Sequence, residues 1–147
     1  MERFRLSNGV KFTSGIVCGI LLYAMIDIWS AGIVAGIILY AIIGFVMIWV
    51  LFNMPLYLKV DSKQIIIRHP IGKTKILRSE VKEIIPIDRQ AISSSIRLFG
   101  SGGFLGWHGI FYNREIGRYS MFSGDRENLH LIRTANKQYI ISSKNSL

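Results

Sequence analysis

Cysteine, histidine and proline are all scarce in this sequence. Cys18 is the one cysteine among 147 residues, which excludes an internal disulfide framework and any cysteine-based metal site. The three histidines have no histidine at i+4 and no cysteine nearby, so the spacing of zinc ligands is missing. Phosphate-binding and dinucleotide fingerprints and the G-x-S-x-G motif are missing too. We therefore expect no catalytic residues, no metal site and no cofactor.

Acidic side chains are also few, and basic side chains outnumber them. The chain has 18 Lys or Arg and 9 Asp or Glu residues, and its net charge is +9. No helix-turn-helix, zinc or RNP pattern accompanies this charge, so we expect no nucleic-acid partner. An anionic membrane surface attracts well-placed Lys and Arg with about 1 kcal/mol each. The alternative is that the charge serves only solubility and membrane orientation.

Apolar residues, by contrast, form a continuous run over residues 12–52, in which Asp27 is the one formal charge. At roughly 1.5 Å per residue, helices over 12–29 and 31–52 would be about 27 and 33 Å long. A hydrocarbon core about 30 Å thick needs helices of this length. The sequence thus predicts a two-helix transmembrane hairpin over residues 1–54. A cleaved signal peptide is the alternative for the first run, but its cleavage site is poor and a second run follows at once.

Basic residues flank the hairpin on one side. Arg3, Arg5 and Lys11 precede the first span and five Lys or Arg residues follow the second by position 75, whereas the loop between the spans has none. Positive flanks stay in the cytoplasm. We therefore expect both termini to be cytoplasmic.

Small residues form a row on each predicted span, and such rows let helices approach closely. They permit two interpretations. In the first, the two spans pack on each other within one chain; in the second, they form the seam of a homo-oligomer, as in a small transport or channel accessory subunit. The residues concerned are Gly15, Gly19, Gly32, Gly36 and Gly44.

After Pro55 the hydrophobic period changes to two, which is typical of strands. The sequence predicts an all-β domain over residues 55–147 of seven or eight short strands, with residues 80–87 as an edge strand because of Pro86. Residues 100–113 hold five glycines and four aromatic side chains and are predicted to form a functional loop. The other strands are expected at 56–60, 64–69, 74–77, 96–99, 118–122, 129–134 and 138–142.

Part of this domain resembles a known family. The run Arg97–Tyr119, with its glycine-aromatic centre, and the segments 125–132 and 139–142 are similar to bacterial pleckstrin-homology-like (PH-like) domains. The resemblance covers about residues 55–143. It implies an antiparallel PH-like barrel of two nearly orthogonal sheets, no catalysis, and a place behind N-terminal spans in a bacterial cytoplasmic (inner) membrane. His108 and Ile110 depart from the pattern.

The resemblance also implies a C-terminal helix that closes one end of the barrel. Only five residues follow Ser142, and they have no amphipathic period, so this helix is expected to be short or absent. The membrane, a partner or the predicted glycine-aromatic loop would then cover that end.

Basic and aromatic side chains make the best candidate for a ligand or partner surface. Guanidinium groups suit phosphate and carboxylate groups, and interfacial aromatics suit lipid or protein. We expect a membrane-anchored binding or scaffold protein that engages a protein partner or anionic lipid headgroups. The alternatives are a channel accessory subunit, a membrane-tethered hydrolase using His108, or aromatics that fold inward as core. The candidate residues are Arg97, Trp107, His108, Tyr112, Arg114, Arg118 and Arg126.

Overall fold

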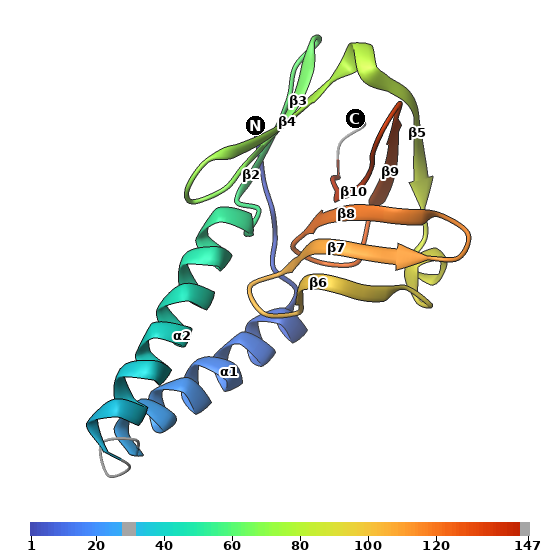
Figure 1. The fold of residues 1–147 in the computed structure, drawn as a ribbon. Helices are drawn as coiled ribbons and strands as arrows, with labels where there is room; N and C mark the ends of the chain where they lie inside the picture. The colour runs from blue at the N-terminus through green and yellow to red at the C-terminus, as the bar shows by residue number, and fades with distance from the viewer. Residues whose placement is uncertain (28–31, 145–147) are drawn as a thin grey trace.

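Two helices lead into a domain built of strands (Figure 1). The structure, a computed structural model, describes residues 1–27 and 32–144. Helix α1 spans Asn8–Asp27 and helix α2 spans Ile33–Asn53. Both are long and apolar enough to cross a membrane, and most of their large apolar side chains are exposed. The two predicted helices are therefore confirmed; the predicted loop between them and the adjoining span ends, residues 28–31, lie outside the described residues.

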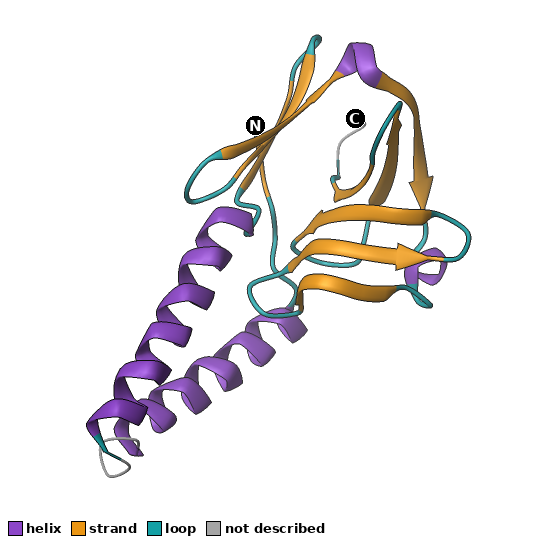
Figure 2. Ribbon diagram, viewed as in Figure 1, coloured by secondary structure: helices purple, strands orange, loops and turns teal. Residues whose placement is uncertain are grey.

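The glycines of the two helices do not form a seam between them. A Cβ added at Gly15, Gly19 or Gly44 would have no described neighbour within 4 Å, and the same holds for Gly32. At Gly36 the nearest atom, 3.9 Å away, belongs to Tyr40 of the same helix. None of these glycines thus marks a close approach of the two spans in the described chain. The helices diverge toward the β-domain (Figure 2), and near their other ends the Tyr40 hydroxyl of α2 donates to the Met25 carbonyl of α1 at 3.1 Å. The homo-oligomer seam stays a prediction.

The strands form two sheets. One has the order β1-β2-β3-β4 and the other has the order β5-β9-β10-β8-β7-β6. Neighbours pair antiparallel except β8 and β10, which run parallel. The bounds are β1 Glu2–Arg3, β2 Tyr57–Val60, β3 Gln64–Arg68, β4 Lys73–Leu77, β5 Val81–Ile87, β6 Ile96–Gly102, β7 Trp107–Asn113, β8 Gly117–Ser123, β9 Leu129–Thr134 and β10 Gln138–Ser142.

Two sheets of this kind are consistent with the PH-like fold predicted from the sequence, although the strands do not close into one barrel in the described chain. The predicted edge strand at 80–87 is confirmed as β5, an outer strand of the larger sheet. Pro86 is tolerated there because an outer strand has one unpaired side.

The predicted loop over residues 100–113 is wrong. This segment is the greater part of a β-hairpin, β6–β7, with a short turn at 103–106. Gly100 and Gly109 are cross-strand partners, and both have positive φ, at 116° and 127°. A Cβ at Gly109 would lie 2.2 Å from the Phe99 carbonyl oxygen. Here the glycines let two strands approach closely, whereas glycine density in a sequence indicates a loop.

The larger sheet has a packed face on each side. Between the two sheets lies a core to which both contribute, including Ile65 and Ile67 of β3 and Ile141 of β10. A second core lies on the other face of the larger sheet, around Phe111 and Tyr119. The larger sheet therefore divides the domain into two interiors.

The N-terminal segment lies between the two sheets. Phe4 is buried in the shared core, and its backbone N–H donates to the Leu56 carbonyl at 3.0 Å. Further along, Ser7 N–H donates to the Gly124 carbonyl at 3.2 Å. No pattern in the sequence predicts this segment, and β1 was not predicted. The division of the chain at residues 54 and 55 stays a prediction, but residues 2–7 pack as part of the β-domain.

The N-terminal segment contacts the residues that follow β10. No helix follows β10 among the residues described up to Lys144. Glu2 instead accepts hydrogen bonds from the Ser143 hydroxyl at 2.8 Å and the Lys144 backbone N–H at 3.0 Å. The chain therefore ties its two ends together across the gap between the sheets.

Candidate ligand-binding site

The β6–β7 hairpin lies next to the ends of α1 and α2 that adjoin the β-domain (Figure 2). On one side, the Leu105 backbone N–H in its turn donates to Ser14 Oγ of α1 at 2.9 Å. On the other side, the Phe99 ring meets Trp49 of α2 edge to face, with ring centroids 4.9 Å apart. Ser14 lies in the second turn of α1, and Trp49 lies in the last turn of α2. The hairpin consequently contacts both helices within the turns nearest the β-domain.

Side chains alternate across this hairpin, so that its two faces differ. On β7, Trp107 and Phe111 point to the second core, whereas His108 and Tyr112 point to the opposite face. Arg97 of β6 is the cross-strand partner of Phe111 and shares its face. The strand register thus brings Arg97 and Trp107 together, although they are ten positions apart.

A cavity of about 340 Å³ opens on the first of these faces. Arg126 reaches it from the β8–β9 connection, and its guanidinium carbon lies 4.1 Å from the centroid of the Trp107 ring, a cation–π contact. Arg97 lines the same cavity, and its Nη1 atom and the Trp107 ring both lie within 3.5 Å of the position that a Cβ at Gly102 would take. At the floor of the cavity, the Tyr119 hydroxyl donates to Ser95 Oγ at 2.8 Å. The lining residues are Ser95, Arg97, Gly102, Trp107, Phe111, Tyr119, Met121 and Arg126.

The charge of this cavity is uncompensated within the described residues. Neither Arg97 nor Arg126 forms an ion pair there, and no described carboxylate lines the cavity. The buried Nε of Arg126 has no hydrogen-bond partner among the described atoms. Burial lowers the pKa of Arg126 from its usual value, and the nearby charge of Arg89 lowers it further. Two guanidinium groups without a described counterion have the charge and hydrogen-bond donors that suit an anion.

A second cavity of about 420 Å³ adjoins the first and shares Gly102, Trp107 and Arg126 with it. It extends to the start of α1, where Ser7 and Gly9 lie, and it includes Arg89. Asp125 and Glu127 also line it, so negative charge is present in this part. The wholly basic part is therefore the first cavity, and the second connects it to the first turn of α1.

His108 is fully buried and is not part of a surface, which corrects its place among the candidate residues. Its ring lies 5.7 Å from that of Trp49, and neither ring nitrogen has a hydrogen-bond partner among the described residues. Burial lowers the pKa of His108 to about 4, and the nearby His69 lowers it as well. The buried imidazole of His108 packs against Trp49 of α2, and no described carboxylate orients it as a general base.

Three further candidates lie near cavity-lining residues in the chain or the sheet but do not themselves line the cavity. Tyr112 and Arg118 are cross-strand partners near the β7–β8 turn, and Arg114 lies in that turn. All three are exposed. The structure thus brings together Arg97, Trp107 and Arg126 and separates them from the rest of the predicted cluster.

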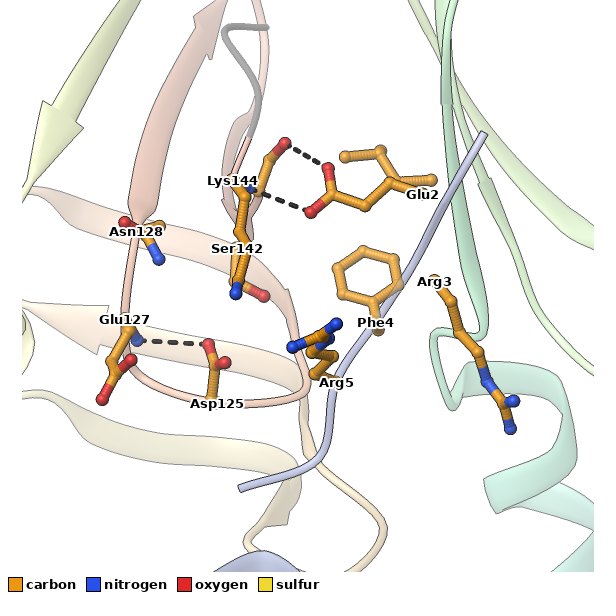
Figure 3. Close-up of a pocket in the computed structure, with 11 residues that line it drawn as sticks. Glu2, Arg3, Phe4, Arg5, Asp125, Glu127, Asn128, Ser142 and Lys144 are labelled. Atoms are coloured by element: carbon orange, nitrogen blue, oxygen red, sulfur yellow. Dashed lines mark hydrogen bonds between the residues drawn. The ribbon is translucent and has the colours of Figure 1, made fainter. Parts of the chain in front are cut away.

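Another cavity, of about 430 Å³, lies beside the N-terminal segment (Figure 3). Glu2, Arg5, Asp125 and Lys144 line it together with seven other residues. Burial raises the pKa of the Asp125 carboxyl. Acidic and basic side chains alternate around this cavity, and Glu2 is already occupied by the hydrogen bonds to residues 143 and 144 (Figure 3). The cavity around Arg97, Trp107 and Arg126 is called the arginine cavity below. The mixed charge of the cavity beside the N-terminal segment makes it a weaker candidate for a charged ligand than the arginine cavity.

Comparison with known proteins decides the family. The family model of the bacterial PH domain matches residues 56–146, well over half of the chain. This chain belongs to the bacterial PH domain family. Comparison with curated proteins and with solved structures returns no match in either case. The family supports a binding role, since PH domains are generally non-catalytic binding modules.

Beside the arginine cavity of this PH domain lies one residue that the sequence did not reveal. Arg89 lies in a 3₁₀ turn, Arg89–Ile92, and comes close enough to Arg126 to affect its pKa. The two residues are 37 positions apart and no motif connects them, so only the fold could show it. In the described part of the PH-domain chain, no group of three or more His, Cys, Asp or Glu side chains could hold a metal ion.

Proposed function

We propose that this chain is a membrane-anchored PH-like binding protein, and that its arginine cavity binds the phosphate group of an anionic lipid headgroup. The two apolar helices span a bacterial cytoplasmic membrane, and both termini lie in the cytoplasm. The β-domain stands on the cytoplasmic leaflet and acts as a binding module or scaffold. A protein partner is the alternative ligand.

The observation that carries this proposal is the pair of unpaired guanidinium groups around Trp107. Arg97 and Arg126 face one cavity with no described carboxylate in its lining. Guanidinium forks match phosphate oxygens, and each charge-assisted hydrogen bond contributes about 1.5–3 kcal/mol. The Ser95 hydroxyl at the floor offers a further polar contact.

The position of the cavity supports a ligand from the membrane. It connects through the adjoining cavity to Ser7 and Gly9 at the start of α1. A helix that enters a bilayer begins at headgroup level, so a phosphate group of a neighbouring lipid would be within reach. Arg3, Arg5 and Lys11, near the same end of α1, add to the attraction of an anionic leaflet.

The test uses the full chain in an uncharged maltoside detergent with phosphatidic acid, phosphatidylglycerol or phosphatidylcholine added. Bound lipid is measured by native mass spectrometry. We expect the anionic lipids to bind and the double variant Arg97→Gln/Arg126→Gln to lose at least about tenfold in affinity, because two phosphate contacts disappear.

A matched control removes the same charge at exposed positions away from both faces of the hairpin, on β5 and in the β9–β10 turn. The double variant Lys82→Gln/Lys137→Gln should change the affinity less than about threefold. An equal loss in both double variants would mean that overall charge, not the cavity, attracts the lipid. Unchanged binding in the cavity variant would refute the lipid ligand and leave a protein partner as the remaining ligand of this module.

The proposed sidedness has its own test. A reporter enzyme that is active only outside the cytoplasm, fused after Leu147, should be inactive in cells, whereas a cytoplasmic reporter at the same place should be active. The opposite result would place the β-domain on the other side of the membrane.

A further inference from the structure

The β6–β7 hairpin carries an exposed apolar patch on the face opposite the arginine cavity. Ile96, Phe99 and Tyr112 form this patch together with Leu98, which lies beside them at the bulge between Arg97 and Phe99, and the four residues are 43–64% exposed. Ile96 and Tyr112 are cross-strand partners, and Phe99 follows along the same strand. Four large apolar side chains gathered on one outer strand and its neighbour are unusual on a folded domain and indicate an interaction surface.

The patch is continuous with the apolar surface of α2. The Phe99 ring touches Trp49, which lies four residues before the end of α2, and Phe52 and Leu51 of the same helix are exposed as well. On the other side of this helix end, the β3–β4 turn brings the exposed Ile71 close, with its backbone N–H donating to the Leu51 carbonyl at 3.1 Å. Lipid that surrounds the end of α2 would therefore also meet Phe99 and Ile71.

The charge around the patch fits an anionic surface. Strands β6, β7 and β8 contain no Asp or Glu, whereas Arg118 is the cross-strand partner of Tyr112 and Arg114 lies in the turn beside Tyr112. Glu115 is the one acidic residue of that turn. Apolar side chains with a basic rim bind at the boundary between headgroups and acyl chains.

We propose that this patch docks the β-domain onto the lipid leaflet, with Leu98 and Phe99 entering the interface and Arg114 and Arg118 binding headgroups at the rim. The inference rests on the proposed anchoring of the helices in a bilayer. It gives Tyr112, Arg114 and Arg118 a role that is separate from the arginine cavity on the other face. The hairpin would then be held on one side by the spans and on the other by lipid.

The test measures how deep position 98 lies in a membrane. The full chain with Cys18→Ser receives a single cysteine at Leu98 or, as the matched control, at Asn136 in the exposed β9–β10 turn. Each variant carries a nitroxide label and is reconstituted in vesicles of phosphatidylethanolamine and phosphatidylglycerol at 3:1. Collision with oxygen reports lipid, and collision with a water-soluble nickel chelate reports water.

We expect the label at position 98 to collide several-fold more often with oxygen than with the nickel chelate, and the label at position 136 to show the reverse. Equal, water-exposed behaviour at both positions would overturn the inference. Dipolar broadening at position 98 that disappears on dilution with unlabelled protein would assign the patch to a second copy of the chain and would overturn it as well.

A second variant separates this inference from the proposed ligand site. Ile96→Ser/Leu98→Ser/Phe99→Ser changes only exposed side chains, and its circular dichroism should remain that of the parent. With the label moved to Tyr112, the contact with lipid should be lost. Headgroup binding in detergent should stay within about threefold of the parent, because the cavity lies on the other face. Retained lipid contact in this variant would refute docking through the patch.

Discussion

The two faces of the β6–β7 hairpin come from one stretch of sequence and have different surroundings. On one face, Arg97 and Trp107 border a basic cavity; on the other, His108 is fully buried against α2. Trp107 and His108 are adjacent in the chain, yet one helps to line the open cavity and the other has no contact with solvent. Strand alternation alone separates them. Adjacent residues in a strand must therefore be assigned to functions face by face.

The largest expected effect comes from disrupting both faces together. Gly109→Ala places a Cβ 2.2 Å from the Phe99 carbonyl oxygen at a φ of 127°, so the two strands can no longer approach. We expect a loss of at least about 4 kcal/mol in the free energy of unfolding. Urea unfolding of the detergent-solubilised chain, followed by near-ultraviolet circular dichroism, measures it.

Gly103→Ala is the matched control for that variant. Gly103 also has a positive φ, at 128°, but a Cβ there would meet no described atom within 4 Å. It should cost only the backbone strain, about 1 kcal/mol. Equal losses at the two positions would show that strain, and not the close approach of the strands, determines the requirement for glycine.

The next largest effect concerns the core between the two sheets. Phe4 is 8% exposed and packs in the core that the two sheets share. Phe4→Ala should lower the free energy of unfolding by about 3 kcal/mol, because a cavity would form where both sheets meet. Arg3→Ala, at an exposed neighbouring position, should change it by less than about 0.5 kcal/mol. A small effect at Phe4 would mean that the N-terminal segment detaches easily from the domain.

The buried imidazole of His108 makes the free energy of unfolding depend on pH. The pKa of His108 is about 4 in the folded chain and about 6.5 when unfolded, so the unfolded state takes up a proton first as the pH falls. Stability is complete above about pH 6.5 and decreases toward pH 4, with about 2 kcal/mol lost at pH 5. His69 acts in the same direction, since burial lowers its pKa too.

His108→Leu should remove most of this pH dependence and should raise stability at pH 5. The comparison is urea unfolding at pH 5 and pH 7.5. His130→Leu, which removes an imidazole from β9, serves as the control. An unchanged pH dependence in His108→Leu would show that other groups cause it.

The sequence predicted the main elements because their signals are local. Two long apolar runs predicted α1 and α2, and the period of two with Pro86 predicted β5 at an edge. Residues 100–113 were wrongly predicted as a loop, since glycine marks both turns and closely approaching strands. The sequence does not reveal the backbone φ of a glycine. Here only the cross-strand pairing of Gly100 with Gly109 shows that these glycines belong to closely approaching strands and not to a loop.

The candidate site was predictable only in part. Arg97, Trp107 and Arg126 were identified by residue type, but their separation from Tyr112 depends on strand register and on a bulge between Arg97 and Phe99. Arg89 and the N-terminal segment come from distant parts of the chain and carry no motif. Burial of His108 follows from its contact with α2, and no local pattern in β7 indicates that contact.

The smallest expected effect concerns the cavity face alone. A Cβ at Gly102 would lie 2.9 Å from Arg97 Nη1 and 3.3 Å from the Trp107 ring. The arginine side chain is flexible, so Gly102→Ala should leave stability within about 0.5 kcal/mol and move the guanidinium off the ring. Lipid affinity should then fall roughly threefold. If the effect acts through Arg97, the combined Gly102→Ala/Arg97→Gln variant should bind no more weakly than Arg97→Gln alone, whereas additive losses would show that Gly102 contacts the ligand itself.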